Sequence, residues 1–328
     1  MANRAGEGLR AAVIGVGYLG RFHAQKYARM EGVKLVAVAD SQYERAMRVA
    51  GELGVEAVRD YTDLLAKVDL VSVVTPTHTH YSVAAACLSA GVHVLVEKPM
   101  TMTLEEADGL IALADKLDRV LQVGHIKRFH PAVNALESRG LLLRPHFIEA
   151  HRFAPFKNRA LDVDVVLDLM IHDVDLILHF VDSKVTEIEA VGAPVVTGHV
   201  DMANARIRFE NGCTATVSAS RVAKEATRRM WIYQDNELIE LDFIRNGVVL
   251  TRRGAGVREM DGIQVPVIEE TSLPVIPHDS LEAEIHSFCQ AVRKISPVRV
   301  SGRDGRQALD VVMTIRRRIA ESGLGGAS

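Results

Sequence analysis

The chain has 328 residues, 48% apolar and 25% charged, a balance typical of globular proteins that excludes a disordered, collagen-like or membrane-bundle chain. Lysine and arginine number 39 against 42 acidic residues, in no block of one sign, so the charges predict binding to neither nucleic acid nor a membrane. At about 100–200 residues per domain, two domains are expected. Three widely spaced cysteines, Cys87, Cys213 and Cys289, favour a reducing cytoplasm over a disulfide framework.

The first part of the chain alternates short apolar runs with helix-like segments. Arg10 and the apolar run 11–20 imitate a short signal peptide, but the run holds three glycines and no cleavage site follows, which predicts a strand and a turn. Strands buried on both faces and separated by helices indicate a parallel, doubly wound sheet. The expected strands are 11–17, 33–40, 68–76, 92–99 and 119–124, and the expected helices are 18–30, 43–53, 80–90 and 104–117.

The pattern changes after residue 124. One long apolar helix is expected at 165–181, and two helices, near 279–294 and 303–321, close the chain. Between them, runs that alternate apolar and polar residues indicate a mostly antiparallel sheet with one wetter face. These runs are 185–196, 200–210, 213–220, 228–234, 237–243 and 247–253. The sequence thus predicts an α/β chain: a dinucleotide-binding Rossmann domain at 1–124 and an α+β domain for substrate binding and oligomerisation at 125–328.

A glycine-rich turn follows the first strand and opens the first helix. Its glycines have separate tasks: a tight turn, close approach of the backbone to a pyrophosphate, and close packing of helix on strand. Asp40 ends the second strand 20 residues further on, where a carboxylate binds the ribose hydroxyls of NAD and repels the 2′-phosphate of NADP. The alternative is a glycine-rich turn in an unrelated α/β protein. The turn consists of Gly15, Val16, Gly17, Tyr18, Leu19 and Gly20.

Other candidate cofactor contacts lie where later strands end. Glu97, Lys98 and Pro99 follow one strand, and ligands of open α/β sheets bind beyond such carboxyl ends. A lysine here is expected to face the cofactor, although an ordinary surface lysine is the alternative. Three further residues that follow a strand, Thr75, Pro76 and His80, are expected to line the same cleft.

The apolar helix 165–181 carries one polar stripe. Asp168, His172, Asp175 and His179 recur at helical spacing and must face water, a ligand or polar partners. A solvated face explains Asp173 and His179 better than it explains Asp168 and His172. The stripe does not converge as tightly as a zinc-binding HExxH motif, so no metal is expected.

Taken in order, these motifs resemble the Gfo/Idh/MocA oxidoreductase family. The resemblance rests on GVGYLG, on EKP and on D-x-x-x-H-x-x-D, and it spans roughly Leu9 to Ile319. It implies an NAD-dependent enzyme in which Lys98, Asp168 and His172 act on a substrate hydroxyl. His172 is expected to accept the proton, Lys98 to stabilise the alkoxide and Asp168 to orient the imidazole, although Lys98 and His172 could exchange roles. Two residues after the motif's aspartate, where the family usually has glycine, this chain has Met170.

A basic segment precedes the expected helix 165–181. The planar guanidinium groups of arginine match the geometry of phosphate oxygens. Arg152 and Arg159, with Arg128 earlier in the chain, are the expected substrate contacts beside the catalytic residues; a solvated loop is the alternative. Residues 152–178 resemble a bacterial subgroup that oxidises the 3-hydroxyl of UDP-N-acetylglucosamine in lipid A biosynthesis.

Two other functions stay open at this stage: a dehydrogenase of a free sugar or cyclitol, and a non-catalytic NAD-binding regulator or sensor. The resemblance also implies a homodimer or homotetramer that pairs through the second sheet.

Overall fold

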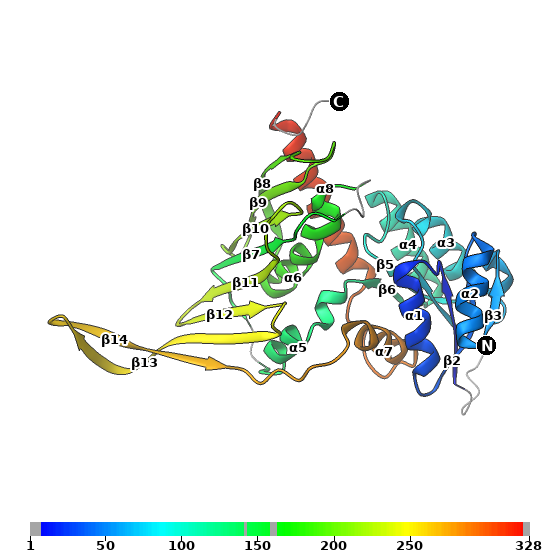
Figure 1. Cartoon of the computed structure of the whole chain (residues 1–328), viewed down its shortest axis with the longest axis horizontal. Helices are drawn as coiled ribbons and strands as arrows, with labels where there is room; N and C mark the ends of the chain where they lie inside the picture. The colour runs from blue at the N-terminus through cyan, green and yellow to red at the C-terminus, as the bar shows by residue number, and fades with distance from the viewer. Residues whose placement is uncertain (1–7, 141–142, 158–162, 324–328) are drawn as a thin grey trace. The chain divides into compact units, whose positions relative to one another are not determined.

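The computed structural model describes residues 8–140, 143–157 and 163–323, which divide into two units. The first unit is built on a six-stranded sheet of order β3-β2-β1-β4-β5-β6 in which every neighbouring pair is parallel (Figure 1). This confirms the predicted Rossmann fold, since the order reverses direction at β1. The strands are β1 (Leu9–Ile14), β2 (Val33–Ala39), β3 (Glu56–Val58), β4 (Leu70–Val73), β5 (His93–Glu97) and β6 (Leu121–Gly124).

The helices of this unit follow from local signals in the sequence. Thr103 and Glu106 form a capping box that starts α4, because each side chain bonds the other's backbone N–H. Gly54 ends α2 in the left-handed conformation that glycine adopts most easily. The helices are α1 (Tyr18–Arg29), α2 (Tyr43–Leu53), α3 (Thr77–Ser89) and α4 (Leu104–Leu117), with a 3₁₀ turn η1 at Tyr61–Leu64.

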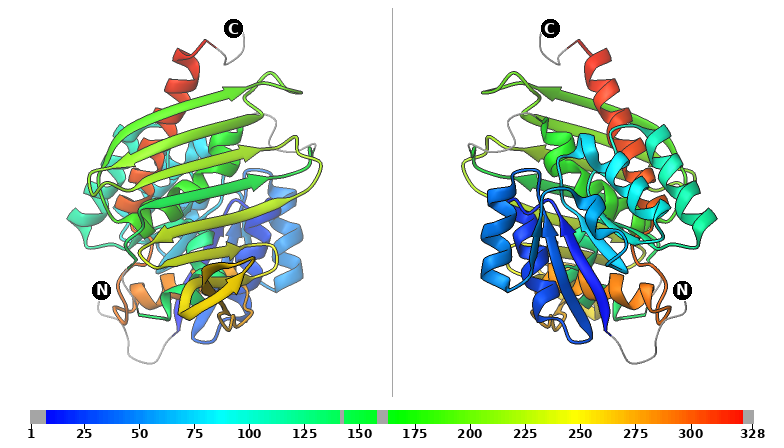
Figure 2. Two further views of the ribbon diagram at one scale, coloured as in Figure 1. Left: turned by 90° about the vertical axis from the view of Figure 1, so that its left-hand side faces the viewer. Right: turned by 90° about the vertical axis from the view of Figure 1, so that its right-hand side faces the viewer.

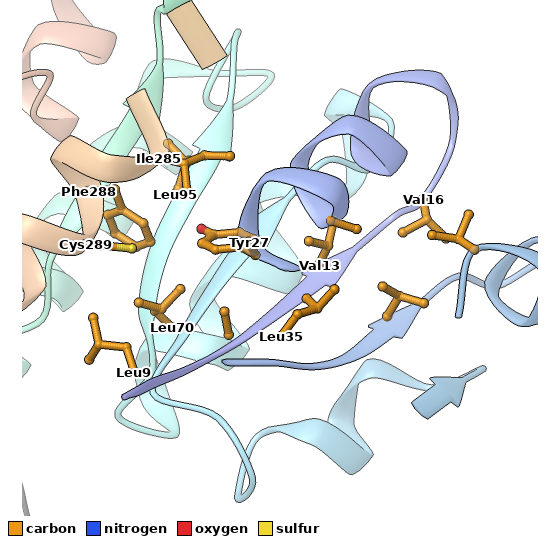
Figure 3. Close-up of a cluster of buried hydrophobic side chains, with 14 of the residues drawn as sticks. Leu9, Val13, Val16, Tyr27, Leu35, Leu70, Leu95, Ile285, Phe288 and Cys289 are labelled. Atoms are coloured by element: carbon orange, nitrogen blue, oxygen red, sulfur yellow. The ribbon is translucent and has the colours of Figure 1, made fainter. Parts of the chain in front are cut away.

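A helix from near the chain's end completes the core of the first unit. In α7 (Ser280–Val292), Ile285, Phe288 and Cys289 are fully buried and pack with Tyr27 and Leu95 (Figure 3). The first unit therefore comprises residues 8–126 and 279–309, whereas the sequence pattern predicted a second domain that spans 125–328 without interruption. Periodicity identifies a helix but does not show which core the helix packs against. The sequence pattern alone therefore could not place α7 in the first unit.

The second unit is built on an eight-stranded sheet of order β14-β13-β12-β11-β7-β10-β9-β8 (Figure 2). All neighbours are antiparallel except β7 and β10, which run parallel, so the predicted mostly antiparallel sheet is confirmed. The strands are β7 (Phe147–Phe153), β8 (Val185–Ala193), β9 (Met202–Phe209), β10 (Thr214–Ser220), β11 (Thr227–Gln234), β12 (Glu237–Asp242), β13 (Gly247–Met260) and β14 (Ile263–Ser272).

The outer ends of β13 and β14 extend past the rest of the sheet as a two-stranded ribbon (Figure 1). Its apolar side chains are exposed: Val257 is 52% exposed, Met260 50% and Ile263 66%. Pro266 lies in β14 at the sheet's edge, where a residue without an N–H discourages a further strand from pairing. The ribbon thus offers exposed apolar side chains.

Helices of the second unit pack on one face of its sheet. The predicted helix 165–181 begins as a π-helix, η3 (Val166–Met170), and continues as α6 (Ile171–Val181), which contacts β7 and β10. A π-helical turn is wider than an α-helical one and is frequent at functional sites. The remaining helices are a 3₁₀ turn η2 (Ile126–Phe129), α5 (Pro131–Glu137) and α8 (Gly302–Glu321), which passes from the first unit into the second after Leu309.

A buried carboxylate fixes the turn before β9. Asp201 is fully buried and accepts hydrogen bonds from the backbone N–H groups of Val195, Val196 and Thr197 at 2.7–2.8 Å. Burial alone would raise the pKa of Asp201, but these bonds outweigh it and lower the pKa to about 2.

Across the described ranges, no helix is both long and apolar enough to cross a membrane.

Candidate functional site

The glycine-rich turn lies between β1 and α1, and its geometry explains each glycine. Gly15 has a φ of +87°, which side-chain-bearing residues rarely adopt. A Cβ at Gly20 would lie 1.8 Å from the carbonyl oxygen of Gly15, so only glycine lets α1 pack this close. At Gly17 the backbone is open, because a Cβ there would meet nothing nearer than Arg45 Nη1 at 3.9 Å. The open backbone at the start of α1 fits a dinucleotide pyrophosphate, which the N–H groups and dipole of the helix would stabilise.

Asp40 is held beside this turn in a fixed orientation. Its Oδ2 accepts a hydrogen bond from the backbone N–H of Val16 at 3.0 Å, and its Oδ1 accepts one from Gln42 N–H at 2.9 Å. Arg45 Nη1 lies 3.3 Å from Oδ2. A cavity of about 370 Å³ opens here, lined by Gly17, Tyr18 and Arg45 among others. A carboxylate aimed at this position suits ribose hydroxyls, as expected for NAD.

Residues after β4 and β5 lie at the carboxyl edge of the same sheet. His80 is buried and its two ring nitrogens contact the carbonyl oxygens of Pro99 and Thr75 at 2.9 and 2.8 Å. Burial lowers the pKa of His80, and the two carbonyl contacts oppose that shift. His80 therefore ties the segments that follow β4 and β5 to one another, and Pro76, next to Thr75, is the N-cap residue of α3.

Lys98 directly follows β5 and is half-buried, and the peptide bond to Pro99 is cis. Beside it, Glu97 receives a contact from buried His23, whose Nε2 lies 3.2 Å from Glu97 Oε1. A Cβ at Gly124 would come within 2.8 Å of Glu97 Oε1, so the carboxylate lies directly over β6. Glu97 is thereby immobilised next to the candidate catalytic lysine.

The second unit carries the other candidate catalytic residues. Asp168 lies in the π-helix and His172 in the first turn of α6, and both side chains are partly buried. Met170, where the family usually has glycine, is fully buried. Its side chain is accommodated in the interior of this unit, within the widened π-helical segment.

Two buried ion pairs hold α6 in place. Arg128 donates through Nε and Nη2 to both oxygens of Asp175, at 2.8 and 2.9 Å. Arg152 does the same to Asp173, with both distances 2.6 Å. All four side chains are at most 4% exposed, so both arginines position this helix from inside the unit. Arg159, the third predicted substrate contact, lies outside the described residues.

Asp173 and His179 were expected on a solvated face. That expectation is wrong for Asp173, which is 1% exposed and satisfied by a guanidinium from β7. His179 is exposed and contacts Glu137 at 2.6 Å. The partner of Asp173 lies 21 residues earlier, beyond the reach of helical periodicity.

Lys127 is a further charged residue of this region, next to Arg128 in the sequence. Burial and the nearby cations of Arg152 and Arg228 together lower its pKa to about 8, and Asp173 opposes this shift. At neutral pH the ammonium group stays mostly protonated. No spacing pattern in the sequence marks this lysine.

The residues of the first unit fit a dinucleotide and define the class of protein: an NAD-binding Rossmann oxidoreductase. A family model described as "Oxidoreductase family, NAD-binding Rossmann fold" matches residues 9–125, and the model of the GFO/IDH/MocA C-terminal domain matches residues 142–240. The chain belongs to the Gfo/Idh/MocA family. The predicted family, enzyme class and cofactor are thereby confirmed.

Similarity to individual proteins extends over nearly the whole chain. UDP-N-acetylglucosamine 3-dehydrogenase from Acidithiobacillus ferrooxidans is 44% identical over 308 residues, covering 94% of this chain and 96% of that protein. A solved structure of that enzyme, GnnA, has a TM-score of 0.88 at 42% identity and covers 96% and 98% of the two chains. Myo-inositol 2-dehydrogenase from Thermotoga maritima is 28% identical over 330 residues, covering 95% and 97%.

A scyllo-inositol dehydrogenase from Lactobacillus casei, solved with NAD(H) and scyllo-inositol, has a TM-score of 0.78 at 20% identity and shares the fold.

Proposed function

We propose that this protein oxidises the 3-hydroxyl of UDP-N-acetylglucosamine with NAD and yields the 3-keto sugar nucleotide. The observation that carries the proposal is the 44% identity over 94% of the chain to an enzyme with that name. The retained residue types at Lys98, Asp168 and His172 support catalysis rather than ligand sensing alone. In lipid A biosynthesis, an aminotransferase would consume the ketone.

We propose further that Lys98, Asp168 and His172 act on the same substrate hydroxyl. NAD supplies the acceptor for the hydride that leaves the carbon. His172 accepts the hydroxyl proton, because a neutral imidazole is a competent base near neutral pH. The Lys98 ammonium donates a hydrogen bond to the oxygen and stabilises its developing negative charge. Asp168 orients the imidazole.

The substrate-binding role expected of Arg128 and Arg152 takes a different form in this proposal. Each guanidinium spends two donors on a buried carboxylate of α6, so we assign both arginines to the positioning of His172 and Asp168. Arg159 remains a candidate contact to the substrate pyrophosphate.

NADH absorbance after mixing NAD-loaded protein with UDP-N-acetylglucosamine tests the proposal. We expect absorbance to rise with the sugar nucleotide and not with N-acetylglucosamine or myo-inositol. Calorimetry should show binding of both UDP-N-acetylglucosamine and UDP. Lys98→Met should abolish turnover and leave NAD binding intact, and His172→Gln should do the same if histidine is the base.

A second candidate function is oxidation of a free sugar or cyclitol, favoured by the similarity to a myo-inositol dehydrogenase. NADH formation from a free sugar, without binding of UDP, would establish it instead. Absence of turnover on every sugar, with NAD still bound, would favour a regulatory protein.

We propose that the protein assembles as a homodimer or homotetramer through the second unit. The sheet face away from α6 carries partly exposed aromatic side chains from β7 and β11, including Phe147, Trp231 and Tyr233. The projecting ribbon of β13 and β14 adds exposed apolar residues, and an isolated two-stranded ribbon is marginally stable in water. Light scattering should report a multimer, and Trp231→Arg with Ile263→Asp should shift it to the monomer mass. A monomeric wild type would refute the assembly.

We also propose a cytoplasmic location. It is supported by three free, buried cysteines, which fit a reducing compartment. Cell fractionation tests it directly.

A further inference from the structure

A cavity lies at the amino end of the first unit's sheet, opposite the carboxyl edge that carries the NAD-binding residues. It has a volume of about 270 Å³ and lies beside the starts of β5 and β6, with walls from α4, α7 and the start of α8. The floor is apolar and includes Ile111, Val120 and Leu121. Common ligand pockets have volumes of about 300–1,000 Å³. This cavity is slightly smaller, so it suits a small molecule and not a nucleotide.

The tautomer of the His93 imidazole decides whether its Nε2 donates or accepts a hydrogen bond at the cavity wall. Nδ1 of His93 accepts a hydrogen bond from the backbone N–H of Val120 at 2.9 Å. Burial, with Arg119 and Lys294 nearby, lowers the pKa of His93 to about 4, so the ring is neutral at pH 7. A neutral imidazole carries one proton, and because Nδ1 is an acceptor that proton is on Nε2.

Nε2 of His93 lies 3.3 Å from Nη1 of Arg119, which is also a donor. A hydrogen bond between them would need a lone pair on Nε2, and the tautomer set by Val120 leaves none there. His93 and Arg119 both line the cavity, and two of their N–H donors lie close together, so an oxygen atom that accepts from both would remove the conflict.

The hydrogen bonds of Arg119 to carbonyl oxygens are both to the backbone, and the neighbouring Asp118 carboxylate interacts with it only through space. Nε of Arg119 donates to the carbonyl oxygen of Leu117 at 3.0 Å and its Nη1 lies 3.4 Å from that of Gly91. Within the described ranges no carboxylate forms an ion pair with Arg119. Two other cations at the rim of the cavity do have carboxylate partners. These cations are Lys294, paired with Asp118, and Arg303, paired with Asp115; all four are at least 60% exposed.

We propose that this cavity is a second ligand site for a small organic carboxylate. Its oxygens accept hydrogen bonds from Nε2–H of His93 and from the guanidinium of Arg119. Its short apolar body rests on the floor formed by Ile111, Val120 and Leu121. The site lies at the edge of the sheet away from the glycine-rich turn, so it is separate from the residues that fit the dinucleotide.

Calorimetry on the full-length, NAD-loaded protein tests the site with three probes: butanoate, its neutral analogue butanamide, and inorganic phosphate. We expect butanoate to bind with a millimolar Kd, and the other two at least tenfold more weakly, since butanamide lacks the charge and phosphate lacks the apolar body. Arg119→Met should weaken butanoate at least tenfold. The control Arg303→Met removes a rim cation and should change the affinity less than twofold.

Nitrogen NMR of the His93 ring adds a test on the wild type, which requires no variant to fold. We expect the proton on Nε2 in the free protein and a shift of that signal on addition of butanoate. A proton on Nδ1, butanamide or phosphate binding as tightly as butanoate, an unchanged affinity in Arg119→Met, or a crystal structure with only ordered water between His93 and Arg119 would each overturn the proposal.

Discussion

The ion pair between Arg152 and Asp173 offers a sharp test of how α6 is held. The side chains are 3% and 2% exposed, and the arginine donates two hydrogen bonds of 2.6 Å to the carboxylate. Asp173→Asn keeps the shape of the side chain but removes its charge. The guanidinium of Arg152 then remains buried without a counter-charge.

Removal of one partner of a buried pair costs about 3–5 kcal/mol, because the remaining charge cannot be solvated. For a protein segment of this size, each kcal/mol lowers the Tm by roughly 2–4 °C. We therefore expect a fall of roughly 6–20 °C in the Tm of the transition that unfolds the second unit. Activity measured at lower temperature should fall too, since His172 precedes Asp173 in the helix.

Calorimetric unfolding of four proteins completes the test: the wild type, Asp173→Asn, Arg152→Met with Asp173→Leu, and the control Asp115→Asn. The double variant removes both charges and should be within about 1 kcal/mol of the wild type. Asp115 forms an exposed pair with Arg303, and its loss should cost less than about 1 kcal/mol. The reasoning fails if Asp173→Asn costs no more than Asp115→Asn, or if the double variant is as unstable as the single one.

Three further predictions follow from the first and second units. Gly17→Ala should fold with an unchanged Tm but bind NAD at least tenfold more weakly in calorimetry, whereas Gly20→Ala should unfold the first unit, because its Cβ would overlap the carbonyl of Gly15. Asp40→Ala should lower the kcat/KM preference for NAD over NADP at least tenfold. Asp201, with a pKa of about 2 against about 3.9 unfolded, stabilises the fold above pH 4 and loses this effect as pH falls from about 4 to 2. Urea unfolding of wild type and Asp201→Asn should therefore converge at low pH; parallel curves would refute this.

The sequence was most informative where burial is uniform. The strands β1, β4 and β5 are mostly apolar because both faces of the first sheet are covered, and this pattern is hard to mistake. Two strands of the second sheet went unpredicted. In β7 the outward positions include Glu149 and His151, and in β14 Pro266 interrupts the run, so both segments resemble loops.

The candidate site divides in the same way. Gly15, Gly20 and Asp40 were predictable because their tasks depend on a local turn and on the next strand end. The ion pair of Arg152 was not predictable, because its partner Asp173 lies on another element. The sequence alone does not distinguish a buried arginine from a solvated one. The π-helical start of α6 had no signal either, since its residues fit an α-helical pattern equally well.

The return of α7 to the first core has a consequence for biosynthesis. During translation, residues 8–126 leave the ribosome with Tyr27, Leu70 and Leu95 in place but without Ile285 and Phe288 to cover them. At about 5–20 residues per second, the missing helix follows on the order of ten to thirty seconds later. The nascent Rossmann sheet therefore waits with an apolar surface open to chaperones, and residues 127–278 of the second unit emerge before the first unit can close.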